Sequence, residues 1–269
     1  MSDLLSFKIT IQTIKDNLKM TLIISLLFMG ISVMYSSMFP EFKSMLMEMV
    51  ESGNMDSFNF VEGAEDMALY FGFLNIELYQ IFWILILGIL IGFISASIIS
   101  REIEAKTIDL LMSNPISKKQ IIIEKFLGLI PMILIINFST FFAVCAITIA
   151  INEDINFGYL FMTHVVSTPY FLAVASIGML ISVIIDEKMK ASIIMISIIV
   201  GMFVIKSISI MSPNNKFLGY FSLTHYFNPY DILKAGIVDA VGVVVLIVIV
   251  LECLLLTMFI FERRDINVS

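Results

Sequence analysis

The sequence predicts an all-α integral membrane protein with six transmembrane helices. Of its 269 residues, 59% are hydrophobic and only 14% are charged, well below the roughly 25% charge of soluble domains. Apolar runs of membrane length recur along the whole chain, which has room for about six spans of about 20 residues each. Lysine and arginine gather beside alternate ends of these runs. We therefore expect a single transmembrane domain over residues 1–269 and no soluble catalytic domain.

Charge and composition exclude several other classes of protein. The net charge is −7, and the basic residues are scattered among the ends of apolar runs, which argues against a nucleic-acid-binding face. Cys145 and Cys253 both lie inside apolar runs and are expected to behave as buried free thiols. His164 and His225 are too few and too far apart for a metal site or nucleophilic catalysis. We predict no catalytic residue, no metal site and no cofactor bound by this chain.

The first 19 residues are expected to form an amphipathic elbow helix in the cytoplasmic interface. Apolar residues recur here in steps of three and four, while polar side chains occupy the other faces. The apolar positions are Leu4, Phe7, Ile11, Ile14 and Leu18, and the polar ones are Lys8, Gln12, Lys15 and Lys19. The alternative is a plain polar lead-in to the first span.

Six apolar runs are long enough to cross the bilayer. They cover residues 20–38, 79–99, 126–150, 160–185, 191–211 and 241–261. Pro40 is expected to end the first span, because proline lacks the backbone donor that a helix interior needs. Residues 40–78 then form a long outer loop, with eight acidic residues against the single Lys43. This loop is either an acidic vestibule that attracts cations or a merely soluble loop that is translocated because it carries little lysine or arginine.

The second and third runs are separated by the one long polar stretch in the middle of the chain, residues 100–125. Helical spacing over 101–112 predicts a short amphipathic helix. Its apolar side holds Ile103, Thr107, Leu110 and Leu111, and its polar side holds Glu102, Lys106 and Asp109. Pro115 stops this helix, and Ser117 followed by Gln120 forms a capping box that begins the next one. We predict that this stretch forms a rigid, partly apolar helix–turn–helix segment at the membrane surface.

This loop resembles the first cytoplasmic loop of type-2 ATP-binding-cassette exporter permeases. The chain has E-x-E-x-K-T-x-D-L-L-x-S-N-P-I-S-K-K-Q-x-x-x-x-K, and the family commonly has E-x-G-T-x-E-L-L-L-S-x-P-I-S-R-x-x-I-x-x-x-K. The matching residues are Glu104, Thr107, Leu110, Leu111, Ser113, Pro115, Ile116, Ser117 and Lys125. Lys106 stands where the family usually has glycine, and Asp109 where it has glutamate. The resemblance implies a coupling helix that seats in a groove of an ATPase subunit, whereas the alternative is a solvated loop between spans.

The resemblance also implies which residues meet that ATPase. They are Glu102, Glu104, Lys106, Thr107, Leu110, Leu111, Pro115, Ile116 and Ser117. ATP and Mg²⁺ would then be bound by the partner subunits, since Gly201 to Ser207 lacks the second glycine of a phosphate loop.

Residues 212–239 precede the last span and are rich in aromatic residues broken by glycine and proline. The ending N-P-Y-D-I-L-K-A-G is similar to the re-entrant segment that the same family places on the outer side. An aromatic-rich surface loop is the alternative. A re-entrant segment is possible only where its backbone is covered by protein.

Basic residues set the orientation, because lysine and arginine near span ends stay cytoplasmic. Twelve of the sixteen fall in the segments expected to be inside. They are Lys8, Lys15, Lys19, Arg101, Lys106, Lys118, Lys119, Lys125, Lys188, Lys190, Arg263 and Arg264. We expect the 100–125 loop and both termini to be cytoplasmic, in the plasma membrane of a prokaryote.

Glu252 is the only acidic residue deep within a predicted span. An ionisable group in a membrane helix is costly and by default suggests function, here in transport. The competing interpretation is a structural hydrogen bond to Asn137, Ser139 or Thr140 of another span.

The function predicted from these observations is that of a permease subunit without its own ATPase site. Two copies, identical or related, would form the pathway of an exporter, and two separate ATPase chains would drive it. A secondary transporter is the alternative, but it would be expected to show doubled halves and coupling acids in several spans. An intramembrane enzyme would need clustered acidic or histidine residues within the spans. The cargo is left open between a peptide, a lipid, a drug and an ion.

Overall fold

The computed structural model describes residues 7–53, 60–108 and 116–264. Over these residues the chain is helical without any β-strand, and six helices are long and apolar enough to cross a membrane, which confirms the predicted fold class. They are α1 (Lys8–Glu51), the continuous run of α2 (Tyr70–Leu74), η3 (Asn75–Leu87) and α3 (Gly88–Ala96), then α6 (Lys118–Ile151), α7 (Phe157–Ile184), α8 (Lys188–Met211) and α10 (Ala240–Arg263). The shorter elements are η2 (Ala64–Asp66), α4 (Ser100–Glu104), η4 (Pro213–Phe221), η5 (Leu223–His225) and α9 (Pro229–Ala235).

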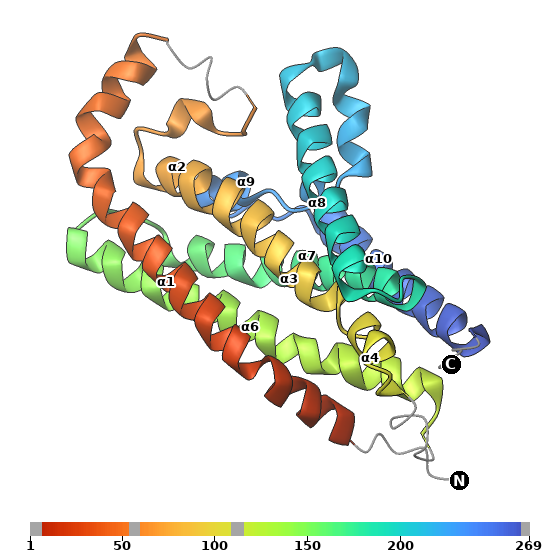
Figure 1. Cartoon of the computed structure of the whole chain (residues 1–269). Coiled ribbons are helices and arrows are strands. Elements are labelled where there is room, and N and C mark those ends of the chain that lie inside the picture. The colour runs from red at the N-terminus through yellow and green to blue at the C-terminus, as the bar shows by residue number, and fades with distance from the viewer. Residues whose placement is uncertain (1–6, 54–59, 109–115, 265–269) are drawn as a thin grey trace.

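The bundle is organised around α7, which contacts α3, α6, α8, α9 and α10 (Figure 1). Small residues allow this close packing. A Cβ added at Gly178 of α7 would lie 2.1 Å from Ser95 Oγ of α3, and one at Gly92 would lie 2.6 Å from Ile199 of α8. Helices in a bilayer pack through such small residues, because lipid supplies no hydrophobic drive for helices to associate. α1 lies outside this core and packs mainly along α6.

The predicted division of the first segment into an elbow helix and a span is wrong. α1 is one continuous helix from Lys8 to Glu51, and Pro40 lies inside it. A proline in a helix interior costs about 3 kcal/mol, so packing must hold this part of the helix together. The ring of Phe39 lies 5.2 Å from those of Tyr70 and Phe73, and Lys43 pairs with Glu153 at 3.0 Å. At 1.5 Å per residue α1 is about 66 Å long and extends well beyond a hydrocarbon core of about 30 Å.

The outer loop is consequently shorter than the predicted 40–78. α1 continues to Glu51, and the second span begins at Tyr70 instead of Tyr79. Tyr70 and Phe73 of this stretch lie in α2 and pack on Phe39. The span then continues with wide π-helical turns through η3, where Tyr79 and Trp83 are fully buried.

Two spans expose most of their outward faces. On α10, Leu251, Leu255 and Phe259 are at least half exposed, and α8 similarly exposes Ile193 and Val204. These apolar faces suit contact with lipid or with a second membrane protein.

Residues 212–239 form η4, η5 and α9 in place of a simple surface loop. η4 runs back beside the end of α8, and the two form a projection at the top of Figure 1. Ser222 donates to the backbone oxygen of Met202, nine residues before the end of α8, so the chain returns to that depth. α9 follows and contacts α2, η3 and α7.

Candidate functional site

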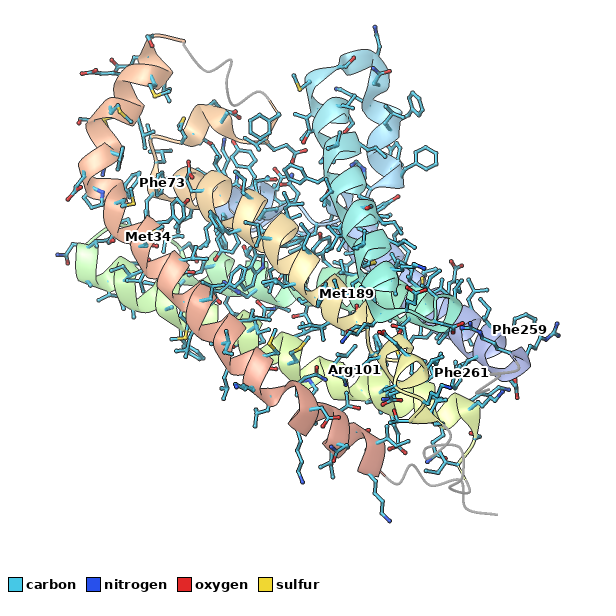
Figure 2. All side chains as sticks on the ribbon, viewed as in Figure 1. Met34, Phe73, Arg101, Met189, Phe259 and Phe261 are labelled. Carbon is cyan, nitrogen blue, oxygen red and sulfur yellow. The ribbon has the colours of Figure 1, made fainter. Side chains whose placement is uncertain are left out.

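The predicted coupling loop lies at the end of the molecule where α1, α6 and α8 begin and α10 ends (Figure 1). Arg101 and Phe261 mark this end in Figure 2. Glu102, Glu104, Lys106, Thr107, Ile116 and Ser117 are described here, whereas Leu110, Leu111 and Pro115 lie outside the described residues.

The predicted helix over 101–112 is not continuous, because α4 ends at Glu104. Lys106 adopts a left-handed backbone with φ 55°, and the N–H of Thr107 donates to the oxygen of Glu102 at 2.9 Å. This six-to-one bond around a left-handed residue is a Schellman motif, which ends helices and favours glycine at its left-handed position. The motif gives a physical reason for the glycine that the family pattern has at this position. Lys106 itself therefore adopts a conformation that lysine accepts less readily than glycine.

The first tie between the loop and the spans is an ion pair of Glu102 on α4 with Lys125 on α6. Their side chains are only 17% and 5% exposed. The other carboxylate oxygen of Glu102 is buried and has no hydrogen-bond partner among the described residues. A buried charge left without its partner is strongly destabilising, so this pair holds α4 firmly on α6.

A second tie joins the loop to α8. The Glu104 carboxylate accepts a hydrogen bond at 2.9 Å from the backbone N–H of Lys188, the first residue of α8. The residue at the cap position of α8, Glu187, provides no side-chain cap. Glu104 thus caps α8 from outside the helix, where a negative charge also meets the positive end of the helix dipole.

A third tie, which sequence reasoning missed, joins α6 to α1. Glu124 is fully buried, and its carboxylate accepts from the backbone N–H groups of Ile9 at 3.0 Å and Thr10 at 3.4 Å. Thr10 returns a bond from its hydroxyl to the Glu124 backbone oxygen, and Gln120 donates to the carboxylate at 2.9 Å. α1 has no side-chain cap of its own. The sequence feature that could have revealed this contact is Glu124 itself, an acidic residue on the apolar side of α6, four residues after Gln120.

The loop region also contacts the end of α10. Lys118 donates to the backbone oxygen of Arg264 at 2.8 Å, and Lys119 pairs with Glu262 at 3.1 Å. Arg264 reaches Asp186 in the turn before α8 at 2.6 Å. The two ends of the 101–125 loop are therefore joined to the ends of α1, α6, α8 and α10 that lie beside it.

Several predicted coupling residues remain exposed at this end. Glu104, Lys106, Thr107 and Ser117 are exposed, Glu102 and Ile116 are partly buried, and Ile108 is fully buried. Ser117 caps α6 by accepting from the N–H of Gln120 at 3.1 Å, as the capping-box pattern predicted. The loop is thus anchored at Ile108 and presents polar groups outward.

Asn137 belongs to a polar network inside the bundle. Its amide donates to the backbone oxygen of His164 at 2.7 Å and to Thr168 at 3.0 Å, and its oxygen lies 2.6 Å from His164 Nδ1. The other ring nitrogen of His164 lies 2.9 Å from the hydroxyl of Tyr79. The network, all of it fully buried except Thr168, joins α6, α7 and η3.

The predicted structural hydrogen bond from Glu252 to Asn137, Ser139 or Thr140 is wrong. The partners of Asn137 are on α7, and Ser139 and Thr140 each donate to the backbone oxygen of Ile136. Glu252 is exposed on the outward face of α10, in the turn of Leu251 and Leu255. The structure therefore does not bring Glu252 and Asn137 into one site.

At the opposite end, the acidic outer segment is paired with basic residues. Glu62 pairs with Lys206 and Asp66 with Lys234, each at 2.6 Å, and the Tyr230 hydroxyl lies 2.7 Å from Asp66. Desolvation raises the pKa of the Tyr230 phenol to about 12. Acids of the predicted vestibule are thus partly neutralised by these pairs.

Six helices of membrane length and composition, with a charged loop joined to the ends of four of them, are the features of a multi-pass membrane protein. A comparison with family models matches residues 15–266 to the ABC-2 family transporter proteins. The chain belongs to this family, which confirms the resemblance read from the loop, and it is the transmembrane subunit of an ATP-binding-cassette transporter. Curated proteins yield no match.

Proposed function

We propose that this chain is the permease of an exporter, that two copies form the pathway, and that two separate ATPase subunits engage the 101–125 loop. One observation carries the proposal. The carboxylates of Glu102, Glu104 and Glu124 tie this loop and its exit helix to α6, α8 and α1. A loop bound to three span ends is suited to pass a movement of its partner to the membrane domain.

The chemistry of ATP belongs to the partner subunits in this proposal. They bind ATP with Mg²⁺, and their closure displaces the loop together with the span ends it holds. Access to the pathway then changes by a shift between two arrangements of the spans. Both termini and the loop are cytoplasmic, as the basic residues at this end indicate, and the membrane is the plasma membrane of a prokaryote.

The second copy is expected against the exposed faces of α8 and α10. Glu252 supports the choice of α10, because a carboxylate in the middle of a span is costly where it faces hydrocarbon. A face that meets another permease or a water-filled pathway removes much of this cost. An identical second copy gives a homodimer, and a related permease gives a heterodimer.

Copurification tests this function. A tagged chain is expressed in its native membrane with untagged partners, solubilised mildly and captured. An ATP-binding-cassette ATPase should elute with it, and a Leu110→Asp, Leu111→Asp variant should lose that ATPase while still reaching the membrane. A matched control is Phe221→Asp, which places the same charge at an exposed apolar position of η4, outside the loop and outside the six spans. Capture without an ATPase, or equal capture by the loop variant, would refute the coupling assignment.

A further inference from the structure

A cavity lies at the outer end of the molecule, between the part of α1 that extends beyond the first span and the start of the second span. The two segments line this partly open cavity of about 300 Å³, which is at the lower end of the size range of small-ligand pockets. Its walls are mostly apolar and come from Tyr35, Met38, Phe42, Met45, Leu46, Met49, Met67, Phe73 and Glu77. Phe73 and Met34, labelled in Figure 2, mark this part of the molecule.

Methionine and aromatic residues dominate these walls. Four of the nine are methionines, from α1 and from the segment before α2, and three are aromatic. Methionine side chains are flexible and polarizable, and they line surfaces that accept ligands of varied shape. Aromatic rings attract cations through their faces. The Phe73 side chain holds a fixed position in the cavity wall, because it is buried and its ring centroid lies 5.2 Å from that of Phe39.

Glu77 supplies the one acidic group of the cavity. It is partly buried, and among the hydrogen bonds and ion pairs of the described residues it has no cationic partner. Other acids at this end differ: Glu62 is paired with Lys206 and Glu153 with Lys43. Glu77 is thus an acidic group in an apolar surrounding, and the described residues provide no counter-charge for it.

The position of the cavity favours ligands that enter from the outer membrane interface. Counting about 20 residues per span from Lys19, the last of the N-terminal basic residues, places the outer boundary near Phe39. The methionines at 38, 45 and 49 therefore lie at or beyond that boundary. Amphipathic ions concentrate at this level, with their apolar part in the lipid.

We propose that this cavity binds an amphipathic organic cation, with the apolar body among Met38, Met67 and Phe73 and the charge beside Glu77. The charge of Glu77 and the soft, aromatic walls complement such a ligand in both of its parts. As a cargo site the cavity would rest on the proposed transport function. Binding itself needs no ATPase, so the two proposals fail separately.

The test uses two probes of the same shape and opposite charge. The purified full chain in lipid nanodiscs is titrated calorimetrically with tetraphenylphosphonium and with tetraphenylborate, and empty nanodiscs supply the background. We expect saturable binding of the phosphonium and none of the borate. Glu77→Gln should weaken phosphonium binding by about tenfold or more, because a neutral amide loses the charge attraction in an apolar site.

Two further variants make the result decisive. Glu48→Gln removes an exposed acid of α1 outside the cavity and should leave the affinity unchanged. Met45→Lys, at a position that is 47% exposed and therefore tolerant, places a cation in the cavity and should abolish binding. Equal binding of both probes, an unchanged affinity in Glu77→Gln, or an equal loss in Glu48→Gln would each overturn the proposal.

Discussion

The end of the bundle beside the 101–125 loop and the centre of the bundle both rely on polar contacts, but they are built differently. In the centre, Asn137, His164 and Tyr79 bond to one another and to local backbone, and the network is closed on itself. At the end beside the loop, carboxylates reach from one segment to the backbone at the start of another helix, as Glu124 does to α1 and Glu104 to α8. The central contacts fix helices against each other, and the end contacts attach them to the loop.

The difference indicates a division of labour between the two regions. A closed, buried network changes only at a large free-energy cost, since each unmatched polar group in a low-dielectric interior is penalised. The exposed Glu104 carboxylate makes a contact with the start of α8 that water can replace, so this contact tolerates small shifts. A displacement of the 101–125 loop is therefore expected to move the ends of the spans, whereas the core formed by α6, α7 and η3 keeps its structure.

The largest effect is expected in the centre. Asn137→Leu removes the partner of both the His164 ring and its backbone oxygen and should lower the free energy of unfolding by about 2 to 3 kcal/mol. Trp83, the only tryptophan, lies 5.0 Å from the His164 ring, so its fluorescence reports the unfolding directly. Ser139→Ala, the matched control on the same helix, should change the stability by less than about 0.5 kcal/mol. Equal effects of the two would remove the distinction between the regions.

The Glu102–Lys125 pair should show an intermediate effect. Lys125→Met leaves the Glu102 carboxylate buried without its cation and should cost about 2 kcal/mol, while adding Glu102→Gln should recover much of the loss. A double-mutant cycle measured by thermal unfolding gives this coupling. Additive losses in the double variant would mean that the pair does not hold α4 on α6.

Glu252 should show the smallest effect on stability. Its side chain is exposed on α10 and has no hydrogen-bond partner among the described residues. The free energy of unfolding of Glu252→Gln should therefore lie within about 0.5 kcal/mol of that of the unchanged chain. ATPase capture should also be unaffected. If the second copy covers this face, the two copies should separate more readily or the transport rate should change. A destabilised monomer would show that Glu252 has a structural partner after all.

Much of the fold could be predicted from hydropathy, because a 20-residue apolar run has few alternatives in a bilayer. The sequence-based predictions of helix ends were wrong where contacts between distant parts of the chain determine the structure. Pro40 was expected to end a helix, but the packing of Phe39 on Tyr70 and Phe73 holds the helix through it. The helix over 101–112 was expected from spacing, yet α4 ends at Glu104, before the left-handed Lys106. Local patterns contain no information on such long-range contacts.

The candidate site was predictable only in part for the same reason. Glu104 and Lys125 were found from the loop motif, although the motif did not show that Glu104 caps α8. Glu124 was missed, because its partners Ile9 and Thr10 are more than 110 residues away in the sequence. The predicted hydrogen bond between Glu252 and Asn137 was wrong, because a helical pattern does not specify which neighbouring helix a polar face contacts.

The most direct test of the account follows the movement of α1. In a chain with Cys145 and Cys253 replaced by alanine, an environment-sensitive fluorophore is attached to a cysteine at Ile11, which is 51% exposed in the second turn of α1. The labelled permease is assembled with its ATPase, and the emission is compared before and after addition of ATP, Mg²⁺ and vanadate. Glu124→Gln is the test variant, and Glu187→Gln, an exposed acid in the turn before α8, is the control.

Nucleotide should shift the emission in the unchanged chain and in Glu187→Gln. In Glu124→Gln the ATPase should still copurify, but the shift should fall by at least half, because the contact between α6 and α1 is weakened. An undiminished shift in Glu124→Gln would contradict the claim that the loop drives α1 through this carboxylate.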